Sequence, residues 1–299
     1  MNLRVYSTLA LAVGFGAALA AQSDYVKAIE AFRQAQEERL RNEAGWLTVA
    51  GLHFLNEGES RFGSGPLNDF ILPNAGADEV GVFEFHDGRT TVRGINGGTI
   101  TVNGEAVPSA ELKRGSDLGD NADQITTGTL VLFLHKSGDR WAIRVLDKES
   151  ALLRGFTGRK WFPVDEAYRV TARFVPDAEP RTLPFPNVLG DVETYESPGI
   201  VTFELDGQPY SLRAVSTGRG LWFIFRDLTS GEETYPATRF LNAPAPVDGV
   251  TELDFNKATN PPCAFNPNTT CPLPPQENRL RVRIEAGELD YHKSQHVTN

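Results

Sequence analysis

Three arginines near the C-terminal end of the chain have a spacing that suits anion binding. In the segment RLRVRIE (279–285), Arg279, Arg281 and Arg283 alternate with apolar residues. Alternate side chains of a β-strand share a face, so a strand here would place the three guanidinium groups about 6–7 Å apart in a row. Guanidinium groups bind carboxylate and phosphate groups well. The alternative is that they pair with acidic side chains of neighbouring strands, such as Asp254, on a solvated sheet face.

Polar side chains also gather around a pair of cysteines just before this segment. Cys263 and Cys271 are the only cysteines of the chain, and we expect a disulfide between them in an oxidising compartment. The bridge would hold a proline-rich loop in one shape. The predicted ligand-binding residues are Asp254, Asn256, Asn260, Arg279 and Arg283.

Two carboxylates in the segment FRDLTSGEETYPATRF (225–240) are candidates for acid–base chemistry. Asp227 and Glu233 could work as a general acid and a general base, as paired carboxylates do in glycoside hydrolysis. The alternative is that both are solvated residues beside a Ser-Gly turn. The sequence therefore offers this pair as weak catalytic candidates.

Several well-known catalytic patterns are absent from the sequence. It contains no G-x-S-x-G, no P-loop, no G-x-G-x-x-G and no H-E-x-x-H. His292 and His296 could share a helical face and hold a metal, but a frayed tail is the preferred interpretation. We expect no metal and no cofactor. The net charge of −10 argues against a nucleic-acid surface.

The N-terminal residues have the features of a secretory signal peptide. A basic residue precedes an apolar run from Leu9 to Leu19, and Ala18 and Ala20 match a small-residue cleavage rule. We expect residues 1–20 to be removed and the protein to be secreted into the periplasm or the exterior. No later run reaches the roughly 18 apolar residues of a membrane helix, so an integral membrane protein is not expected. The expected partner is a small molecule or an envelope ligand.

A helix and a set of hairpins must position these residues. Apolar residues at helical spacing predict an amphipathic helical arm at 21–45. At 46–150, three strand–turn–strand patterns are centred on Asp-Gly, Asn-Gly and Ser-Gly pairs, which are typical of hairpins. This pattern predicts a first antiparallel β-sandwich.

The second half of the chain also has strand-length apolar runs. A linker is expected at 151–168, a second β domain with the disulfide loop at 169–288, and a flexible tail at 289–299. The candidate strands are YRVTARFV, IVTFEL, PYSLRAV, LWFIFRDL, RFLNA, TELDF and RLRVRIE. The run PRTLPFPNVLG should be an edge or a surface crossing, because proline cannot donate to a central ladder. The predicted fold is mainly β, with two antiparallel β-sandwich or barrel-like domains preceded by one amphipathic helix.

The first β domain resembles the forkhead-associated sandwich, a family that reads phosphothreonine. The segment RFGSGPLNDFILP, a later VNG and the strand at 128–131 carry this resemblance. Ser64 follows Gly63 where that family has an arginine, so phosphopeptide recognition is not predicted. Asn103 could correspond to a residue of that family, although the preferred interpretation is that it is only a turn residue.

Four blocks resemble the bacterial family DUF1684, a domain of unknown function. They are WFPVDEAYRVTARFVP, PNVLGDVE, FIFRDLTSGEETYPATRFL and DFNKATNPPCAFNPNTTCPLPPQENRL. The resemblance extends from Trp46 to Glu288 and implies a secreted β protein, without an activity or a substrate. We therefore expect a secreted, non-catalytic ligand-binding or envelope-associated module. The alternative is a secreted hydrolase that acts on carbohydrate or ester substrates.

Overall fold

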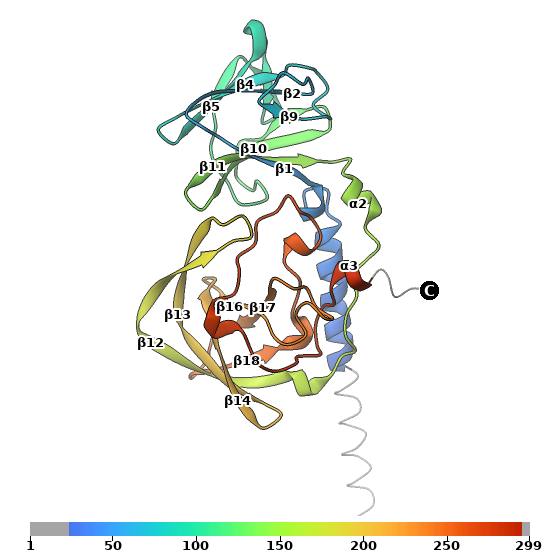
Figure 1. Cartoon of the computed structure of the whole chain (residues 1–299), viewed down its shortest axis with the longest axis vertical. Helices are drawn as coiled ribbons and strands as arrows, with labels where there is room; N and C mark the ends of the chain where they lie inside the picture. Colours follow the sequence, from blue (N-terminus) through green and yellow to red (C-terminus); the bar gives the residue numbers. More distant parts are fainter. Residues whose placement is uncertain (1–23, 295–299) are drawn as a thin grey trace, which may run out of the picture.

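The strands of the protein fall into two sets, which lie one above the other along the long axis of the molecule (Figure 1). The computed structural model describes residues 24–294, so the predicted signal peptide and His296 lie outside the described residues. The predicted mainly β architecture with antiparallel sheets is confirmed, and no sheet of the described chain closes into a barrel.

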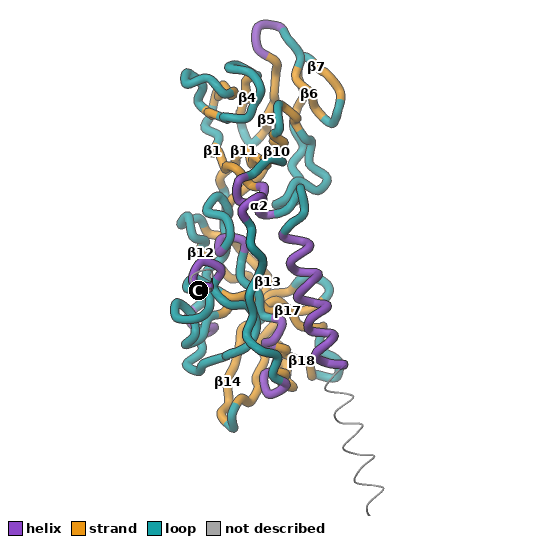
Figure 2. Tube along the Cα trace, turned by 90° about the vertical axis from the view of Figure 1, so that its right-hand side faces the viewer, coloured by secondary structure: helices purple, strands orange, loops and turns teal. Residues whose placement is uncertain are grey.

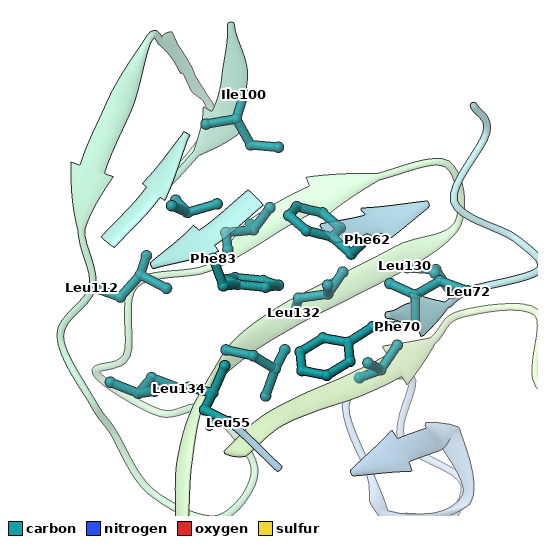
Figure 3. Close-up of a cluster of buried hydrophobic side chains, with 14 of the residues drawn as sticks. Leu55, Phe62, Phe70, Leu72, Phe83, Ile100, Leu112, Leu130, Leu132 and Leu134 are labelled. Carbon is teal, nitrogen blue, oxygen red and sulfur yellow. The ribbon is translucent and has the colours of Figure 1, made fainter. Parts of the chain in front are cut away.

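The first set forms two sheets that face each other. The strand orders are β1-β11-β10-β9-β6-β7 and β3-β2-β4-β5-β8. The bounds are β1 (Val49–Phe54), β2 (Gly58–Gly63), β3 (Phe70–Ile71), β4 (Gly81–His86), β5 (Arg89–Gly94), β6 (Ile100–Val102), β7 (Glu105–Val107), β8 (Ser109–Glu111), β9 (Ile125–Thr127), β10 (Leu130–Ser137) and β11 (Arg140–Asp147). Aromatic and aliphatic side chains from both sheets fill the space between them (Figure 3). Phe62 and Phe83 stack there with ring centres 4.4 Å apart.

The three predicted hairpins of this part are confirmed. β4 pairs with β5, β6 with β7 and β10 with β11, each in antiparallel register. Asp87 and Asn103 adopt the left-handed backbone conformation, with φ of 49° and 51°. Turns of this kind match the twist of paired strands, which is why the Asp-Gly and Asn-Gly signals were reliable.

The second set forms a four-stranded and a three-stranded sheet. The strand orders are β14-β13-β12-β18 and β15-β16-β17. The bounds are β12 (Arg169–Pro186), β13 (Val192–Leu205), β14 (Gln208–Arg213), β15 (Val215–Ser216), β16 (Gly220–Phe225), β17 (Arg239–Pro244) and β18 (Val250–Asp254). A second hydrophobic core lies here, with Phe203, Phe225 and Phe255 packed ring against ring. The division of the chain into domains at the predicted boundaries stays a prediction.

The proline-rich run belongs to β12, which is longer than predicted. Its first residues, 169–173, pair with β18 on one side, whereas residues 172–186 pair with β13 on the other. One edge of the later part is therefore free of a neighbouring strand, and prolines are tolerated at such an edge. The expectation of an edge segment agrees with this pairing.

The predicted strand RLRVRIE is wrong, because this segment is irregular. Three backbone hydrogen bonds join residues 278–282 to residues 226–228, but they form only one bridge, between Arg279 and Arg226. Beyond this contact, the backbone carbonyls of Ile284 and Ala286 accept hydrogen bonds from the buried Arg239 side chain. A guanidinium group is thus the partner of the last part of the segment. The alternation still holds in burial, since Leu280 is buried and Arg279 is exposed.

The long N-terminal helix lies along one side of the second part (Figure 2). The predicted N-terminal helix occupies 24–40 and ends before the expected Gly45. The other helical segments are η1 (Trp46–Thr48), η2 (Ile95–Gly97), α2 (Ala151–Gly155), η3 (Glu166–Tyr168), η4 (Phe255–Lys257), η5 (Pro262–Ala264), η6 (Gln276–Asn278) and α3 (Tyr291–Ser294). α2 lies in the predicted linker, and α3 lies in the predicted tail. Within residues 24–294, no helix has the length and apolarity needed to cross a membrane.

Polar contacts join the two parts. The disulfide between Cys263 and Cys271 closes a loop in which Asn266 donates to the backbone carbonyls of Trp46 and Val49, at 2.8 and 2.6 Å. On the other side of the junction, Asp191 in the β12–β13 turn accepts two hydrogen bonds of 2.7 Å from Arg140 of β11. Ser137 of β10 also donates to Asp191 at 2.8 Å, so the disulfide loop and the β12–β13 turn both hold the junction.

We expect the disulfide to stabilise the fold through the loop that it closes. Replacing both cysteines by serine should lower the free energy of unfolding by about 2–3 kcal/mol, because a short loop regains its chain entropy in the unfolded state. Urea unfolding of the variant and the native protein measures this difference. Equal stability of the two proteins would contradict the expectation.

The Arg140–Asp191 pair predicts a pH dependence at the junction. Hydrogen bonds from Arg140 hold the pKa of the Asp191 carboxyl below its ordinary value of 3.8. A carboxyl of this kind stabilises the folded state above its unfolded pKa, and that contribution is lost as the pH falls through the folded pKa. Asp191→Asn should therefore unfold at a lower temperature than the native protein at pH 7. This gap should close below pH 3.8, as followed by thermal melts, and a gap that persists in acid would count against the ion pair.

Candidate functional site

Two of the predicted ligand-binding residues hold the N-terminal helix instead of facing a cavity. Asp254 accepts a hydrogen bond of 2.9 Å from the hydroxyl of Tyr25, and Asn256 donates to the same hydroxyl at 3.0 Å. Asn256 also donates to the backbone carbonyl of Asp165 at 2.7 Å. Both side chains are buried, so their polar atoms fix the helix against the end of β18.

The remaining predicted ligand-binding residues lie in other networks. Asn260 is buried and donates to the backbone carbonyl of Leu289 at 2.8 Å. Arg283 is paired with carboxylates, including Glu285 at 3.0 Å. Arg279 is exposed. The predicted single anion-binding strip is therefore divided among separate contacts, because the segment that carries it is not a strand.

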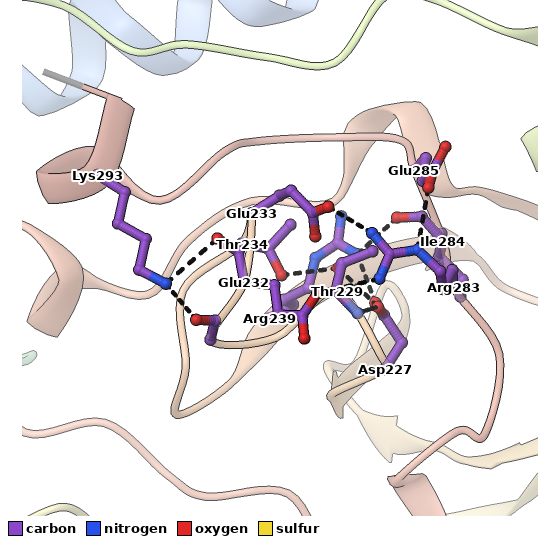
Figure 4. A network of polar contacts seen from close by, with 11 residues as sticks. Asp227, Thr229, Glu232, Glu233, Thr234, Arg239, Arg283, Ile284, Glu285 and Lys293 are labelled. Atoms are coloured by element: carbon purple, nitrogen blue, oxygen red, sulfur yellow. Dashed lines mark hydrogen bonds and ion pairs between the residues drawn. The ribbon is translucent and has the colours of Figure 1, made fainter. Parts of the chain in front are cut away.

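The two catalytic candidates belong to a polar network with Arg239 and Arg283 (Figure 4). Asp227 is buried, and one of its oxygens lies 2.5 Å from the Arg239 guanidinium group. Its other oxygen accepts two hydrogen bonds of 2.6 Å from the backbone and hydroxyl of Thr229. Both oxygens are thus engaged by the protein itself, which supports a structural role for Asp227. Glu233 pairs with Arg283 at the edge of this network.

A pocket of about 480 Å³ lies where the N-terminal helix, the first part and the disulfide loop meet. We call it the first pocket. The helix end contributes Gln36 and Arg39, and the first part contributes Asp120. Its wall also includes Asn260, the one predicted ligand-binding residue that lines it, together with Arg159.

A buried ion pair forms the back of the first pocket. The Nε atom of Arg159 lies 2.7 Å from a carboxylate oxygen of Glu288, and the two side chains are 5% and 1% exposed. The other carboxylate oxygen accepts a hydrogen bond of 2.8 Å from the backbone amide of Asn260. Burial raises the pKa of the Glu288 carboxyl, while the charge of Arg159 opposes that shift. Glu288 therefore orients Arg159 and Asn260 from behind the pocket wall.

The first pocket contains polar atoms that the protein leaves unsatisfied. The side-chain oxygen of Asn260 is buried and has no hydrogen-bond partner. Within the described chain, Arg159 bonds to Glu288 through Nε, and its two terminal nitrogens make no hydrogen bond. An unpaired buried acceptor costs about 1–3 kcal/mol. Two residues of the pocket wall therefore have unsatisfied polar atoms, donors on Arg159 and an acceptor on Asn260.

Two local features of the sequence set up this arrangement. Thr259 pairs with Phe240 of β17 through two hydrogen bonds of 2.9 Å, and the prolines that follow Asn260 cannot continue that ladder. Gly287 has φ of 83°, and an added Cβ would lie 2.6 Å from the carbonyl oxygen of Ala258. This close approach lets the chain turn so that Glu288 reaches beneath Asn260.

The sequence analysis missed Arg159 and Glu288 as functional candidates. They lie 129 positions apart in a linker and near the end of the last predicted domain, and neither is in a motif. The Ala-Gly-Glu sequence at 286–288 was the one local signal, since it combines a glycine suited to a tight turn with a carboxylate.

The Asp227–Arg239 pair allows a test of whether Asp227 has a structural or a catalytic role. Asp227→Ala should lower the free energy of unfolding by about 3–5 kcal/mol, because it leaves the fully buried Arg239 charge without a counter-ion. The double change Asp227→Ala with Arg239→Met should recover part of that loss. Chemical unfolding of the two variants checks this, and a single variant as stable as the native protein would contradict the structural role.

Comparison with known proteins gives a family without an assigned function. No curated protein matches the chain. The solution NMR structure of an uncharacterized protein from gene locus rrnAC0354 of Haloarcula marismortui is 32% identical, covers 46% of this chain and 78% of that chain, and has a TM-score of 0.39. A crystal structure of the FhaA FHA domain complexed with the intracellular domain of Rv3910 is 21% identical, covers 31% of this chain and 96% of that one, and has a TM-score of 0.22.

The family model of DUF1684, described as a protein of unknown function, matches residues 154–289. The matched residues include the second β part, the disulfide loop, and the Arg159 and Glu288 that form the first pocket. Through residues 154–289, the chain belongs to the family of unknown function DUF1684.

Proposed function

We propose that this protein is a non-catalytic binding protein whose first pocket takes a small carboxylate with an N–H or O–H group next to the carboxylate. The observation that carries this proposal is that one pocket is lined both by Asn260, whose side-chain oxygen is unpaired, and by Arg159, whose terminal nitrogens make no hydrogen bond. A ligand that both accepts and donates hydrogen bonds would satisfy both groups. α-Amino acids and α-hydroxy acids have this chemistry.

The charges and the apolar wall of the pocket support the same ligand class. Arg159 presents planar donors that suit a carboxylate, and the exposed Arg39 adds a second cation at the rim. Asp120 also lines the pocket and supplies a negative charge with which an ammonium group could pair. Leu40 and Phe265 provide apolar surface for the rest of the ligand.

Binding without catalysis agrees with the groups that line the pocket. Among the described residues of its wall there is no histidine, cysteine or serine. Glu288 is 1% exposed and acts through its contacts with Arg159 and Asn260. The alternative, a hydrolase that uses Asp227 or Glu233, has less support because Asp227 is fully engaged by Arg239 and Thr229.

The proposal includes export of the protein. The signal-like sequence at 1–20 and the disulfide between Cys263 and Cys271 support an oxidising compartment outside the cytoplasm. There the protein would bind a small molecule or an envelope component that carries the same carboxylate group.

A matched ligand series tests the proposed chemistry. Titration calorimetry at pH 7 should show binding of L-leucine and of its α-hydroxy analogue, 2-hydroxy-4-methylpentanoate. Removing the donor, as in 4-methylpentanoate, should weaken binding by about tenfold or more, because the oxygen of Asn260 stays unpaired. Removing the carboxylate, as in 3-methylbutylamine, should abolish binding. Equal binding of all four compounds, or binding of none, would refute the proposed ligand class.

A matched pair of arginine variants locates the site. Arg159→Lys keeps a cation beside Glu288 but removes the terminal donors, and it should weaken L-leucine binding by about tenfold. Arg279→Ala removes an exposed arginine that does not line the pocket, so binding should be unchanged. Thermal melts confirm that both variants are folded. A loss in Arg279→Ala with none in Arg159→Lys would place the site elsewhere.

A further inference from the structure

A second pocket, of about 750 Å³, lies between the two parts on the other side of Trp46 and Pro262, which line both pockets. Its first-part wall comes from β10 and the β10–β11 turn. Its second-part wall comes from β13, β16, β17 and the disulfide loop. The Arg140–Asp191 pair joins the β11 end to the β12–β13 turn beside it. Nothing in the first-pocket proposal uses this space.

The second pocket has a buried histidine whose hydrogen-bonding role is fixed. His135 is 3% exposed, and its Nε2 atom lies 3.0 Å from a terminal nitrogen of Arg144. A guanidinium group can only donate, so Nε2 must accept and the proton must be on Nδ1. Burial, together with the positive charges of Arg144 and Arg114, lowers the pKa of His135 to about 3. His135 is therefore neutral and presents an N–H donor.

That donor is unsatisfied within the described chain. The Nδ1 atom of His135 is buried and makes no hydrogen bond. The nearest acidic group is Asp117, whose carboxylate oxygen lies 3.5 Å away and whose side chain is 63% exposed. A contact of this length is longer than a hydrogen bond, and because Nδ1 is buried an acceptor reaches it only by displacing a neighbour such as Asp117.

Behind His135 lies a buried cation that forms no ion pair with a described carboxylate. Arg144 is completely buried and donates to the backbone carbonyl of Asp117 at 2.6 Å and to His135. Burial lowers its pKa to about 10, while the negative charges of Asp117 and Glu193 oppose that shift, so Arg144 stays charged at neutral pH. A charge in a protein interior is costly, and the two carboxylates offset only part of that cost. An anion in the second pocket would add to this compensation.

The other charged groups of the pocket are already engaged or lie at its rim. Glu193 accepts a hydrogen bond from the hydroxyl of Tyr195, and Asp139 lies 3.5 Å from Lys136 at the surface. Arg114 is exposed and lines the pocket as a further cation. The pocket therefore contains charges of both signs, and the buried charge in contact with His135 is the cation Arg144.

Aromatic side chains form the wall opposite His135. Tyr195 and Trp222 pack edge to face with ring centres 5.5 Å apart, and Trp222 and Phe240 do so at 4.9 Å. All three line the pocket and are half-buried. Aromatic surface of this kind packs well against a flat ring, and a volume of several hundred Å³ is typical of small-molecule sites.

We propose that the second pocket binds an aromatic carboxylate. Its carboxylate accepts the Nδ1–H of His135 and replaces the long contact to Asp117, with Arg144 and Arg114 providing positive potential. Its ring lies against Trp222 and its aromatic neighbours. This ligand lacks the donor that the first pocket requires, so the two proposals stand or fall separately.

Benzoate and benzamide are the probes that test this inference, because they share a ring and differ in charge. Titration at pH 7, followed by tryptophan fluorescence and by calorimetry, should show saturable binding of benzoate. Benzamide should bind at least about tenfold more weakly, since it brings no charge to compensate Arg144. Acetate, which lacks the ring, should also bind more weakly. Failure of benzoate to saturate, or equal binding of benzamide, would overturn the inference.

Variants assign the binding to the second pocket. His135→Leu removes the donor and should weaken benzoate binding by about tenfold, whereas His135→Gln keeps an acceptor for Arg144 and a donor for the ligand and should restore most of it. Asp117→Asn removes the competing charge at an exposed position, so it should strengthen binding. Arg279→Ala removes an exposed arginine that lines neither pocket, so it should leave benzoate binding unchanged.

These variants also separate folding from binding. If His135→Leu does not fold, because Arg144 loses an acceptor, then Asp117→Asn and Arg114→Ala decide the question. Both are changes of exposed side chains that leave the core intact. Stronger binding in Asp117→Asn and weaker binding in Arg114→Ala support the inference. Unchanged affinity in both variants would overturn it.

Discussion

The buried ion pair between Arg159 and Glu288 holds together three segments that are distant in sequence. Arg159 lies between the two parts, Glu288 lies near the C-terminal end, and the backbone amide of Arg159 donates to Glu37 of the N-terminal helix. Both charged side chains are almost completely buried, and neither charge is tolerable there without the other. The helix, the linker and the C-terminal segment therefore share one point of attachment. The first pocket is open beside that point because Glu288 uses only part of the guanidinium group.

The two pockets have different requirements although they share Trp46 and Pro262. In the first pocket the buried Arg159 already has a carboxylate partner, and the unpaired polar atom is an acceptor, the side-chain oxygen of Asn260. Beside the second pocket the buried Arg144 donates hydrogen bonds only to a carbonyl and a neutral imidazole, and the unpaired polar atom is a donor, the Nδ1 of His135. The difference arises from how each buried arginine is paired.

Polar contacts join the two parts at two places. Asn266 binds carbonyl groups at the start of the first part, and Asp191 pairs with Arg140 at the far end of β11. Because the second pocket lies between these contacts, its shape depends on how the parts are held. The disulfide contributes by restricting the loop that carries Asn266. The disulfide, which lies within the second part, thereby supports the Asn266 contact between the two parts.

Local sequence rules determined much of the fold. The hairpins at Asp87 and Asn103 could be predicted because two residues with left-handed backbone conformation are enough to define such a turn. Alternating burial was also correct in RLRVRIE, since alternation depends on local extension of the chain. The strand itself was wrong, because backbone pairing with residues 226–228 ends at Val282 and Arg239 bonds to the carbonyls of Ile284 and Ala286.

The candidate site depended on contacts that no local pattern encodes. Asn260 was among the predicted ligand-binding residues, and it does line a pocket, whereas Asp254 and Asn256 hold the helix at Tyr25. By itself the sequence determined the β-rich hairpins and the pairing of two nearby cysteines, because turn geometry and short loops are local properties. Tertiary structure alone decided which charged groups are satisfied, since the partner of Arg159 is 129 residues away. Whether a polar atom is left unpaired in a pocket can be known only when all its neighbours are in place.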